Sequence, residues 1–260
     1  MKEEQLYSIM KNLVEQNVPM SFKGAMTLKT VLDSSENNIY RETKDIDANW
    51  YGTKPSMDEL ENIVTKAVKE INPDFSIQIK RAYDDTRSAG FIIHDETGEF
   101  YTSIDIQIKE NPYIQTYETN GFKFQGSTIE KIIADKVNAV SSPQIMRRTK
   151  DLVDLYMIDN FVDFDTEKVA EIILESGKSL GDFSSFLNRK DDLEYAYGKM
   201  KGLKNAPDFE ELYSDVKSFC SDIKIAVYNK KVERIEKQAE QNKAEKTINR
   251  KSITYTGESI

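Results

Sequence analysis

The sequence contains very little cysteine, histidine and tryptophan, with one residue of each among 260, and it has no long apolar run. The single cysteine, Cys220, excludes an intramolecular disulfide and a cysteine-rich zinc site, which fits a reducing compartment. No apolar stretch approaches the roughly 20 residues that cross a bilayer, and the first residues, MKEEQLYSIMKN, lack the apolar segment of a signal peptide. The lone His94 has no second histidine to complete a ligand set. We therefore expect a cytoplasmic protein without a membrane partner.

Acidic residues outnumber basic ones, and the net charge of −9 argues against a surface coated by nucleic acid. The average hides a basic segment, because residues 230–251 contain eight Lys or Arg and four Glu. Such a segment can hold an RNA backbone through contacts with phosphate groups. A solvated helix with pairs such as Glu233 and Lys237, four residues apart, is the more ordinary interpretation.

Hydrophobic periodicity separates a mixed front half from a helical back half. Apolar residues at helical spacing predict helices at residues 3–17, 25–33 and 57–71. Alternation and β-branched residues predict strands at residues 20–22, 44–51, 75–83, 89–96 and 99–108. The last two strands are joined by the turn sequence DETGE, so we expect them to form a hairpin.

From Ser127 onward the pattern is helical, and Ser127 is placed to cap the first helix. The predicted helices cover residues 128–139, 145–161, 166–175, 180–200 and 209–246. We therefore expect an α+β fold in which an α/β front half is followed by an all-helical part. The expected domains are an α/β core at residues 1–126, a helical domain at 127–228, and a charged helix with a flexible tail at 229–260.

Two aspartates, Asp45 and Asp47, lie in the alternating segment RETKDIDANW. Residues i and i+2 of a strand point to the same face, so both carboxylates project together while Ile46 packs behind them. Neighbouring carboxylates repel, and each raises the proton affinity of the other unless they share a cation. Mg²⁺ is commonly held by one or two carboxylates and the phosphates of a nucleotide. The pair therefore indicates either a Mg²⁺ site or the charged edge of an ordinary strand.

Two further segments favour the metal interpretation. In TSIDIQI, the side chains of Ser103, Asp105 and Gln107 share one strand face, so Asp105 can supply a third carboxylate; otherwise it is a solvent-facing residue of the sheet. In SFKGAMTLKTVL, a strand is followed by Gly24 and a helix. Such a turn lets backbone N–H groups at the helix N-terminus approach a phosphate closely.

A second polar cluster falls in the helical half. Lys136 lies in STIEKIIADKVNAV, and Asp151 and Asp154 lie three residues apart, on one side of a predicted helix, in IMRRTKDLVDLYMI. A lysine near a triphosphate neutralises charge that develops during phosphoryl transfer, and an aspartate on a neighbouring helix can orient that lysine or accept a proton. Spacing alone favours a simpler alternative, a pair of salt-bridged surface helices.

Four motifs, taken in order, resemble the AbiEii/AbiGii toxin family. They are K-G-x-x-x-L at residues 23–28, R-x-T-x-D-I-D at 41–47, E-K-x-x-A-D-K at 130–136 and R-x-K-D-L-x-D-L at 148–155. The family comprises nucleotidyltransferase-like toxins of bacterial abortive-infection, type IV toxin-antitoxin systems. The resemblance implies a nucleotidyltransferase core of the DNA polymerase beta type, in which a mixed sheet has flanking helices. It also implies that the helical domain at 127–228 completes the functional site.

The resemblance also assigns roles to residues of this sequence. The implied nucleotide-binding residues are Lys23, Gly24, Arg41 and Thr43. The implied catalytic residues are Asp45, Asp47, Lys136 and Asp151, with Asp154 as a second choice. The implied Mg²⁺ ligands are Asp45, Asp47 and, by analogy with the third carboxylate of the wider superfamily, Asp105.

The implied reaction transfers a nucleoside monophosphate from an NTP to an acceptor with the help of Mg²⁺. Related toxins are similar to enzymes that add nucleotides to tRNA 3′ ends, so RNA, and tRNA in particular, is the implied acceptor, and a cognate antitoxin is the implied partner. Three alternatives stay open: a transferase that modifies a protein, a catalytically idle nucleotide-binding module, and an interaction protein whose charged C-terminal helix docks to a partner.

Overall fold

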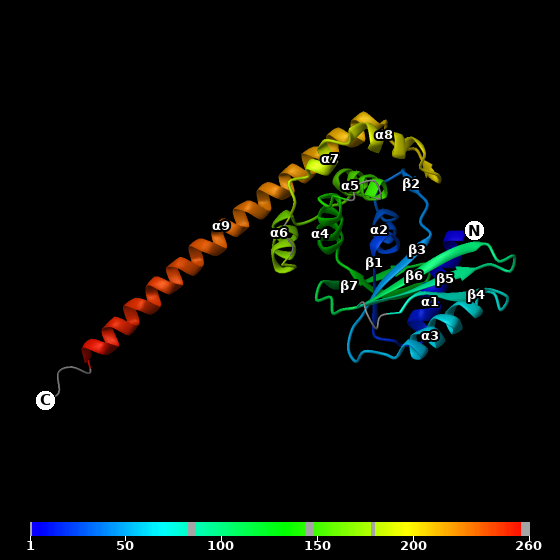
Figure 1. Ribbon diagram of the computed structural model, residues 1–260, viewed down its shortest axis with the longest axis horizontal. Coiled ribbons are helices and arrows are strands. Elements are labelled where there is room, and N and C mark those ends of the chain that lie inside the picture. Colours follow the sequence, from blue (N-terminus) through cyan, green and yellow to red (C-terminus); the bar gives the residue numbers. More distant parts are fainter. Residues whose placement is uncertain (1, 83–86, 144–147, 178–179, 256–260) are drawn as a thin grey trace.

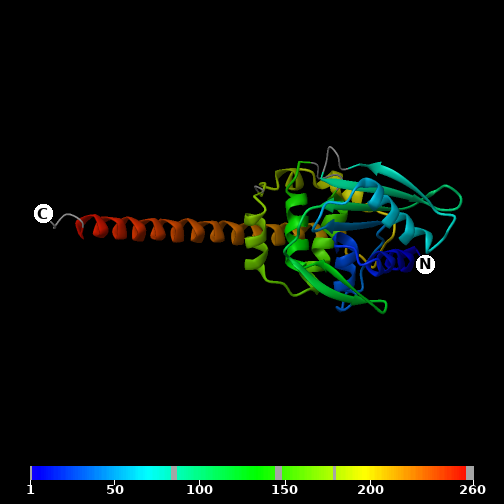
Figure 2. The same ribbon diagram turned by 90° about the horizontal axis from the view of Figure 1, so that it is seen from below.

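The computed structural model describes residues 2–82, 87–143, 148–177 and 180–255, with side chains from Glu3 onward and, in the last helix, as far as residue 242. A sheet and its helices form the body, and the last helix projects far beyond it (Figures 1 and 2). The helices are α1 (Lys2–Glu15), α2 (Gly24–Leu32), α3 (Met57–Lys69), α4 (Ile129–Val140), α5 (Thr149–Phe161), α6 (Thr166–Glu175), α7 (Ser184–Leu187), α8 (Lys190–Gly198) and α9 (Phe209–Tyr255). The strands are β1 (Met20–Lys23), β2 (Tyr40–Arg41), β3 (Asp45–Trp50), β4 (Ser76–Arg81), β5 (Ser88–His94), β6 (Phe100–Ile108), β7 (Ile114–Thr119), β8 (Phe122–Ser127) and β9 (Leu203–Lys204).

The main sheet has seven strands in the order β4-β5-β6-β3-β1-β8-β7. Strand β3 pairs in parallel with β6, and β1 pairs in parallel with β8, whereas the other neighbours are antiparallel. Strand β3 is therefore central, with β1 on one side and β6 on the other. The predicted α+β class with a mixed sheet and a helical second part is confirmed, and so is the predicted β5–β6 hairpin.

Four strands were not predicted: the β7–β8 hairpin and the small β2–β9 sheet. The hairpin had a sequence signal, because Asn120 and Gly121 form a two-residue loop between strands of alternating character. The β2–β9 pair had none, since it joins Tyr40 to Lys204 and Arg41 to Leu203 across most of the chain.

The structure contains two hydrophobic cores, one formed on the sheet and one within the helical half. One contains apolar side chains of α1, α3 and the sheet, and the other contains those of α4, α5, α6, α8 and α9. Helix α2 contributes to both, with Met26 in the first core and Leu28 and Leu32 in the second. The predicted division at residues 126 and 228 therefore stays a prediction, because apolar residues of the first part complete the core of the second.

The transition to the helical half differs by one residue from the prediction. Thr128, not Ser127, is the N-cap of α4, and its side chain accepts a hydrogen bond from the backbone N–H of Lys131. Ser127 is the last residue of β8, and its hydroxyl accepts a bond from the side-chain amide of Asn111. Strand β8 extends to Ser127, one residue beyond the predicted boundary at residue 126, so the N-cap of α4 lies at Thr128.

Helix α9 begins in the second core and continues to Tyr255, beyond the predicted end near residue 246. Lys230 contacts Glu167 and Glu171 of α6 at 3.1 and 2.9 Å, and Arg234 contacts Glu175 at 3.7 Å. Two basic residues of the segment 230–251 therefore face carboxylates of this protein. The end of the predicted flexible tail, residues 256–260, lies outside the described residues. Among the helices described, none combines the length and apolar character that a membrane span requires.

Candidate active site

Strand β3 carries the two aspartates of the predicted metal motif. Ile46 and Ala48 are fully buried in the core formed with α1 and α3, so Asp45 and Asp47 project from the opposite face, toward the helical half. On the neighbouring strand, Ser103 lies opposite Asp45, and its hydroxyl donates to Oδ1 of that aspartate at 2.7 Å. The alternating sequence thus aims both carboxylates into one space and fixes the first of them.

The turn from β1 into α2 brings a helix N-terminus to Asp47. Gly24 has a φ of +67°, and a Cβ atom there would lie 2.7 Å from Oδ2 of Asp47, so glycine leaves room for the carboxylate. Lys23, the N-cap residue, makes no side-chain hydrogen bond to the first turn, and its Nζ donates instead to Oε1 of Gln107 at 2.8 Å. The first turn of α2 therefore lies beside the carboxylates. Backbone N–H groups at a helix N-terminus can bind a phosphate group.

Replacing Gly24 by alanine is expected to lower stability and, given the nucleotide-binding role that the resemblance implies for Gly24, nucleotide affinity as well. The left-handed backbone alone costs about 1–2 kcal/mol for a residue with a Cβ atom, and the new methyl group would also displace Asp47. Gly98→Ala is a matched control, because Gly98 has a φ of +82° but no heavy atom within 4 Å of its added Cβ. Urea unfolding and NTP titration of both variants measure the difference. Equal losses of NTP affinity in the two variants would contradict the role of Gly24 beside Asp47.

The carboxyl group of Asp47 binds its proton unusually tightly. Burial raises its pKa from 3.8 to about 6; the charge of Lys23 opposes this rise, and the neighbouring carboxylates of Asp45 and Asp105 add to it. A cation shared by Asp45 and Asp47 would relieve the repulsion between them. The two carboxylates therefore fit the oxygen donors that Mg²⁺ takes in proteins when nucleotide phosphates supply the rest.

Asp154 of α5 is a buried carboxylate that connects the sheet side to the helical side. Its side chain, 2% exposed, accepts hydrogen bonds from two nitrogens of Arg41 at 2.6 and 2.9 Å and from Nζ of Lys136 at 2.5 Å. Lys136 also donates to Oδ1 of Asp151 at 3.0 Å. Burial disfavours each charge, but the mutual attraction is larger, so the pKa of Asp154 is lowered and the pKa values of Arg41 and Lys136 are raised. Asp154, Arg41 and Lys136 are therefore all held in their charged forms.

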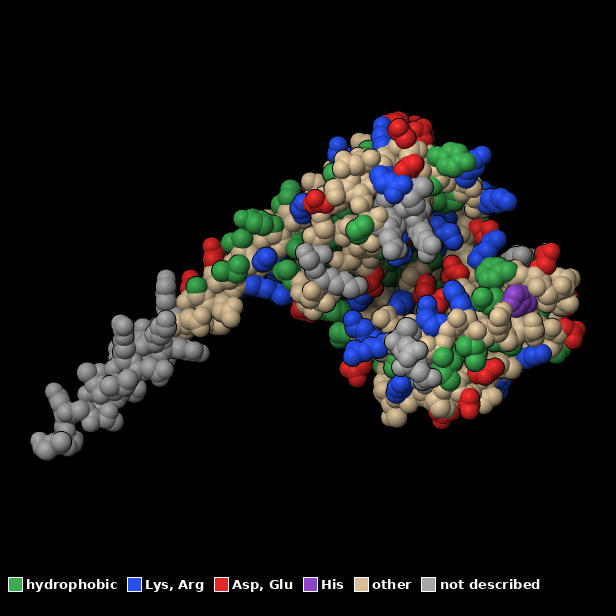
Figure 3. All heavy atoms as spheres, viewed as in Figure 1, with side chains coloured by type: hydrophobic (Ala, Val, Ile, Leu, Met, Phe, Trp, Pro, Cys, Tyr) green, Lys and Arg blue, Asp and Glu red, His purple; other side chains and the backbone are tan. Residues whose placement is uncertain are grey.

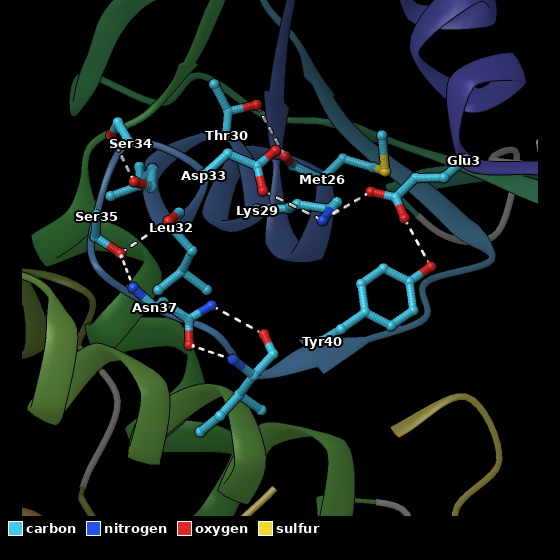
Figure 4. A network of polar contacts seen from close by, with 12 residues as sticks. Glu3, Met26, Lys29, Thr30, Leu32, Asp33, Ser34, Ser35, Asn37 and Tyr40 are labelled. Carbon is cyan, nitrogen blue, oxygen red and sulfur yellow. Dashed lines mark hydrogen bonds and ion pairs between the residues drawn. The ribbon is translucent and has the colours of Figure 1, made fainter. Parts of the chain in front are cut away.

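A polar network fixes the segment that brings Arg41 to Asp154 (Figure 4). The hydroxyl of Tyr40 donates to Oε2 of Glu3 at 2.7 Å, which ties β2 to α1. Nζ of Lys29, on α2, lies 2.9 Å from Oε1 of Glu3 and 5.0 Å from the centre of the Tyr40 ring. These contacts hold the residue before Arg41 from two helices, so the guanidinium is positioned before any ligand binds.

A cleft of ≈ 980 Å³ lies between the carboxylates of β3 and helices α4 and α5. Acidic and basic side chains meet in the hollow between the two halves (Figure 3). Eight of the nine residues predicted to act in the site line this cleft: Lys23, Gly24, Arg41, Thr43, Asp45, Asp47, Lys136 and Asp151. Their roles stay predictions, but the fold brings together residues from four separate motifs.

Asp105 is the ninth predicted residue, and it lies in a smaller adjoining pocket of ≈ 330 Å³. It is directly opposite Asp47 in the β3–β6 register, but its carboxylate contacts Arg81 at 2.5 Å and Lys80 at 3.7 Å. Within the part of the chain that the structure describes, no group of three or more His, Cys, Asp or Glu side chains could hold a metal ion. A metal-binding role of Asp105 stays a prediction that would require its carboxylate to leave these cations.

Sequence reasoning missed several residues that line the two pockets. Asn138 lies two residues after Lys136 on α4 and could have been found by extending that motif along the helix. Lys150 lies within the motif at 148–155 but was given no role. Gln107 follows Asp105 on the same strand face, which is a weaker signal. Arg81 gave no signal, because its approach to Asp105 depends on an irregularity in strand pairing.

Comparisons with known proteins show the family and the fold of the chain. A family model described as nucleotidyl transferase AbiEii toxin, type IV TA system, matches residues 8–224. JHP933 from Helicobacter pylori has a similar fold, with 18% identity, a TM-score of 0.52, and coverage of 92% of this chain and 96% of that chain. MenT4, a nucleotidyltransferase toxin from Mycobacterium tuberculosis, shares 14% identity, with a TM-score of 0.49 and 85% of each chain covered. Comparison with curated protein sequences finds no match. Because the family model matches most of its length, the chain belongs to the AbiEii family of nucleotidyltransferase toxins of type IV toxin-antitoxin systems.

Proposed function

We propose that the chain transfers a nucleoside monophosphate from an NTP to the 3′ end of an RNA, with tRNA as the first candidate. The observation that carries this proposal is the cleft in which Asp45 and Asp47 lie on the same side of the sheet as the first turn of α2 and face Lys136. A nucleoside triphosphate needs cations and N–H donors for its phosphates, and this arrangement offers both. Family membership supports nucleotidyl transfer and implies a cognate antitoxin.

In the reaction, the hydroxyl oxygen of the acceptor forms a bond to the α-phosphorus of the NTP. The bond from that phosphorus to the bridging oxygen breaks, pyrophosphate leaves with the bonding electrons, and the hydroxyl proton passes to water. Asp45 and Asp47 would hold Mg²⁺, which when bound neutralises phosphate charge and lowers the pKa of the attacking hydroxyl. Lys136, held by Asp151 and Asp154, would place an ammonium group near the phosphates.

The charged state of the cleft supports an active enzyme rather than an idle nucleotide-binding module. Lys136 and Asp154 are buried, and burying charge is costly unless the geometry is fixed by pairing. Gly24, with a φ of +67°, leaves room beside Asp47 that a residue with a Cβ atom would fill. Fixed charges and an open position beside a carboxylate are expected of a site that binds phosphate and metal.

The proposal predicts transfer of label from one NTP to RNA. Purified protein is incubated with Mg²⁺, total RNA and each α-labelled NTP in turn, and RNA and protein are separated. We expect label in RNA, none after chelation of Mg²⁺, and a loss of at least about 100-fold with Asp45→Ala or Asp47→Ala. Expression of the wild-type chain should arrest growth, and both variants should relieve that arrest.

The same assay distinguishes the alternatives. Label in protein and never in RNA would show that the acceptor is a protein, while transferase activity would stand. No label in either fraction from folded protein would favour the idle module. Growth arrest that persists in a folded Asp45→Ala, Asp47→Ala double variant would contradict the catalytic basis of toxicity. Asp74→Asn, at an exposed loop position, controls for the loss of a negative charge.

A further inference from the structure

Strand β4 contains an irregularity that directs two basic residues to one carboxylate. Ile79 pairs with Phe91 and Arg81 pairs with Gly90, so Lys80 is an extra residue between two consecutive partners of β5. Successive residues of a regular strand point to opposite faces, whereas a bulge changes this direction locally. As a result, Arg81 and Lys80 both reach Asp105, at 2.5 and 3.7 Å.

The glycine opposite this bulge makes room for the cluster. A Cβ atom at Gly90 would lie 2.9 Å from Oδ1 of Asp105 and 3.5 Å from a terminal nitrogen of Arg81. Gly90 lies inside a strand and has no positive φ, so space for side chains, not backbone conformation, explains the glycine. The bulge and the glycine are two independent features that shape the same small site.

The site is an accessible pocket continuous with the active-site cleft. The ≈ 330 Å³ pocket and the larger cleft share Lys23, Asp47 and Gln107 as lining residues. The side chains of Lys80 and Arg81 are 45% and 37% exposed, which leaves them open to a ligand. Among the described residues, Arg81 uses N–H groups for Asp105 and for the carbonyl of Ser88, so part of its five-donor guanidinium is available.

We propose that Lys80 and Arg81 bind the last phosphodiester group of the acceptor RNA strand. This inference rests on the proposed function and assigns the acceptor to the smaller pocket. In nucleotidyl transfer the attacking and leaving oxygens lie roughly in line through the phosphorus, so donor and acceptor approach the metal carboxylates from different sides. The larger cleft takes the NTP, which leaves the β4 side of Asp47 for the acceptor.

The chemistry of the pocket favours a nucleic acid acceptor over a protein hydroxyl. An arginine and a lysine side by side recognise a phosphate group, with the guanidinium able to form two parallel hydrogen bonds. The terminal hydroxyl and the phosphate on the 5′ side of the same nucleotide share one sugar. A phosphate held by Arg81 would therefore keep that hydroxyl beside Asp47 and Asp105.

The test combines a change in the protein with a change in the RNA. Transfer is measured with a short single-stranded RNA that carries either a normal terminal phosphodiester or a neutral methylphosphonate at the same linkage. In the wild-type chain, the neutral linkage should lower kcat/KM by about tenfold or more, since a charge-assisted contact is lost. In the Lys80→Ala, Arg81→Ala double variant, both RNAs should react at a similarly low rate, because the contact is already absent.

Four measurements separate this inference from the function on which it rests. NTP affinity should be unchanged in the double variant, and Lys123→Ala, at a side chain 69% exposed and outside both pockets, should change neither rate. The single variant Arg81→Lys should react faster than the double variant, because it keeps a positive charge at this position. Such a partial rate would show that the double variant is slow through loss of the contact and not through misfolding. The salt dependence of RNA affinity should weaken by roughly 0.7 in logarithmic slope per lost contact.

The outcomes are distinct. An equal effect of the neutral linkage in wild-type and double variant would overturn the assignment of the pocket, while transfer by the wild-type chain would leave the proposed function intact. Label in protein alone would overturn the RNA acceptor and this inference together. Absence of any transfer by the folded wild-type chain would reject the proposed function itself.

Discussion

Asp47→Asn is expected to stabilise the metal-free protein at pH 8 while abolishing nucleotidyl transfer. Burial, with the nearby carboxylates of Asp45 and Asp105, raises the pKa of Asp47 from 3.8 to about 6, although Lys23 opposes the rise. The fold therefore prefers the protonated form. The associated stability is present below pH 4, where Asp47 is protonated in both states, and is lost as the pH rises through 6. Asparagine does not ionise, so it avoids a penalty on the order of 3 kcal/mol.

Chemical denaturation with a chelator present measures this effect at pH 4 and at pH 8. The free energy of unfolding of Asp47→Asn should exceed that of the wild type at pH 8 and approach it at pH 4. For Asp74→Asn it should equal the wild-type value at both pH values. Added Mg²⁺ should raise the stability of the wild type and leave the variant nearly unchanged, because a ligand stabilises only the state that binds it. Identical stabilities at pH 8 would mean that Asp47 is not electrostatically destabilising. Transfer by the wild type should also decline below pH 6, because protonation of Asp47 would compete with the proposed Mg²⁺.

Asp154→Ala should destabilise the protein by about 3–5 kcal/mol, because it leaves buried cations without their partner. Arg41 and Lys136 have side chains only 6% and 9% exposed, and both donate to Asp154. Asp151→Ala should cost much less, since its side chain is 18% exposed and Lys136 would keep its shorter bond to Asp154. Urea denaturation at neutral pH compares the two variants.

A third variant isolates the origin of the loss. Arg41→Met combined with Asp154→Leu removes a cation and a carboxylate together, and Lys136 keeps Asp151 as a partner. This double variant should be more stable than Asp154→Ala, although its transfer activity should be low because Lys136 is no longer oriented. If the free energy of unfolding of Asp154→Ala lies within about 1 kcal/mol of the wild-type value, water has replaced the lost ion pairs. The network would then not be important for stability.

The local parts of this site could be predicted from the sequence. Alternation in KDIDANW placed Asp45 and Asp47 on one face of a strand, and the glycine after Phe22-Lys23 placed a turn before a helix. Such features depend on neighbours two to four residues apart, where the backbone geometry is nearly fixed. The resemblance of four ordered motifs then related Lys136 and Asp151 to the strand, which spacing alone did not.

The long-range parts could not be predicted. Arg41 was assigned to the nucleotide, yet in the structure it pairs with Asp154, 113 residues away in sequence. That pairing depends on the angle between the sheet and α5, which no local pattern encodes. The bulge near Lys80 is similar, because a shift in strand register leaves no signature in composition.

Helix α2 connects the two halves of the molecule. Its apolar side chains belong to both cores, and its first residue borders Asp47. A change in cleft width would therefore carry α2 with the helical half and pull its N-terminus away from the carboxylates, or else break one of its two packing surfaces. The width of the cleft and the position of the first turn of α2 beside Asp47 therefore cannot change independently without loss of apolar packing.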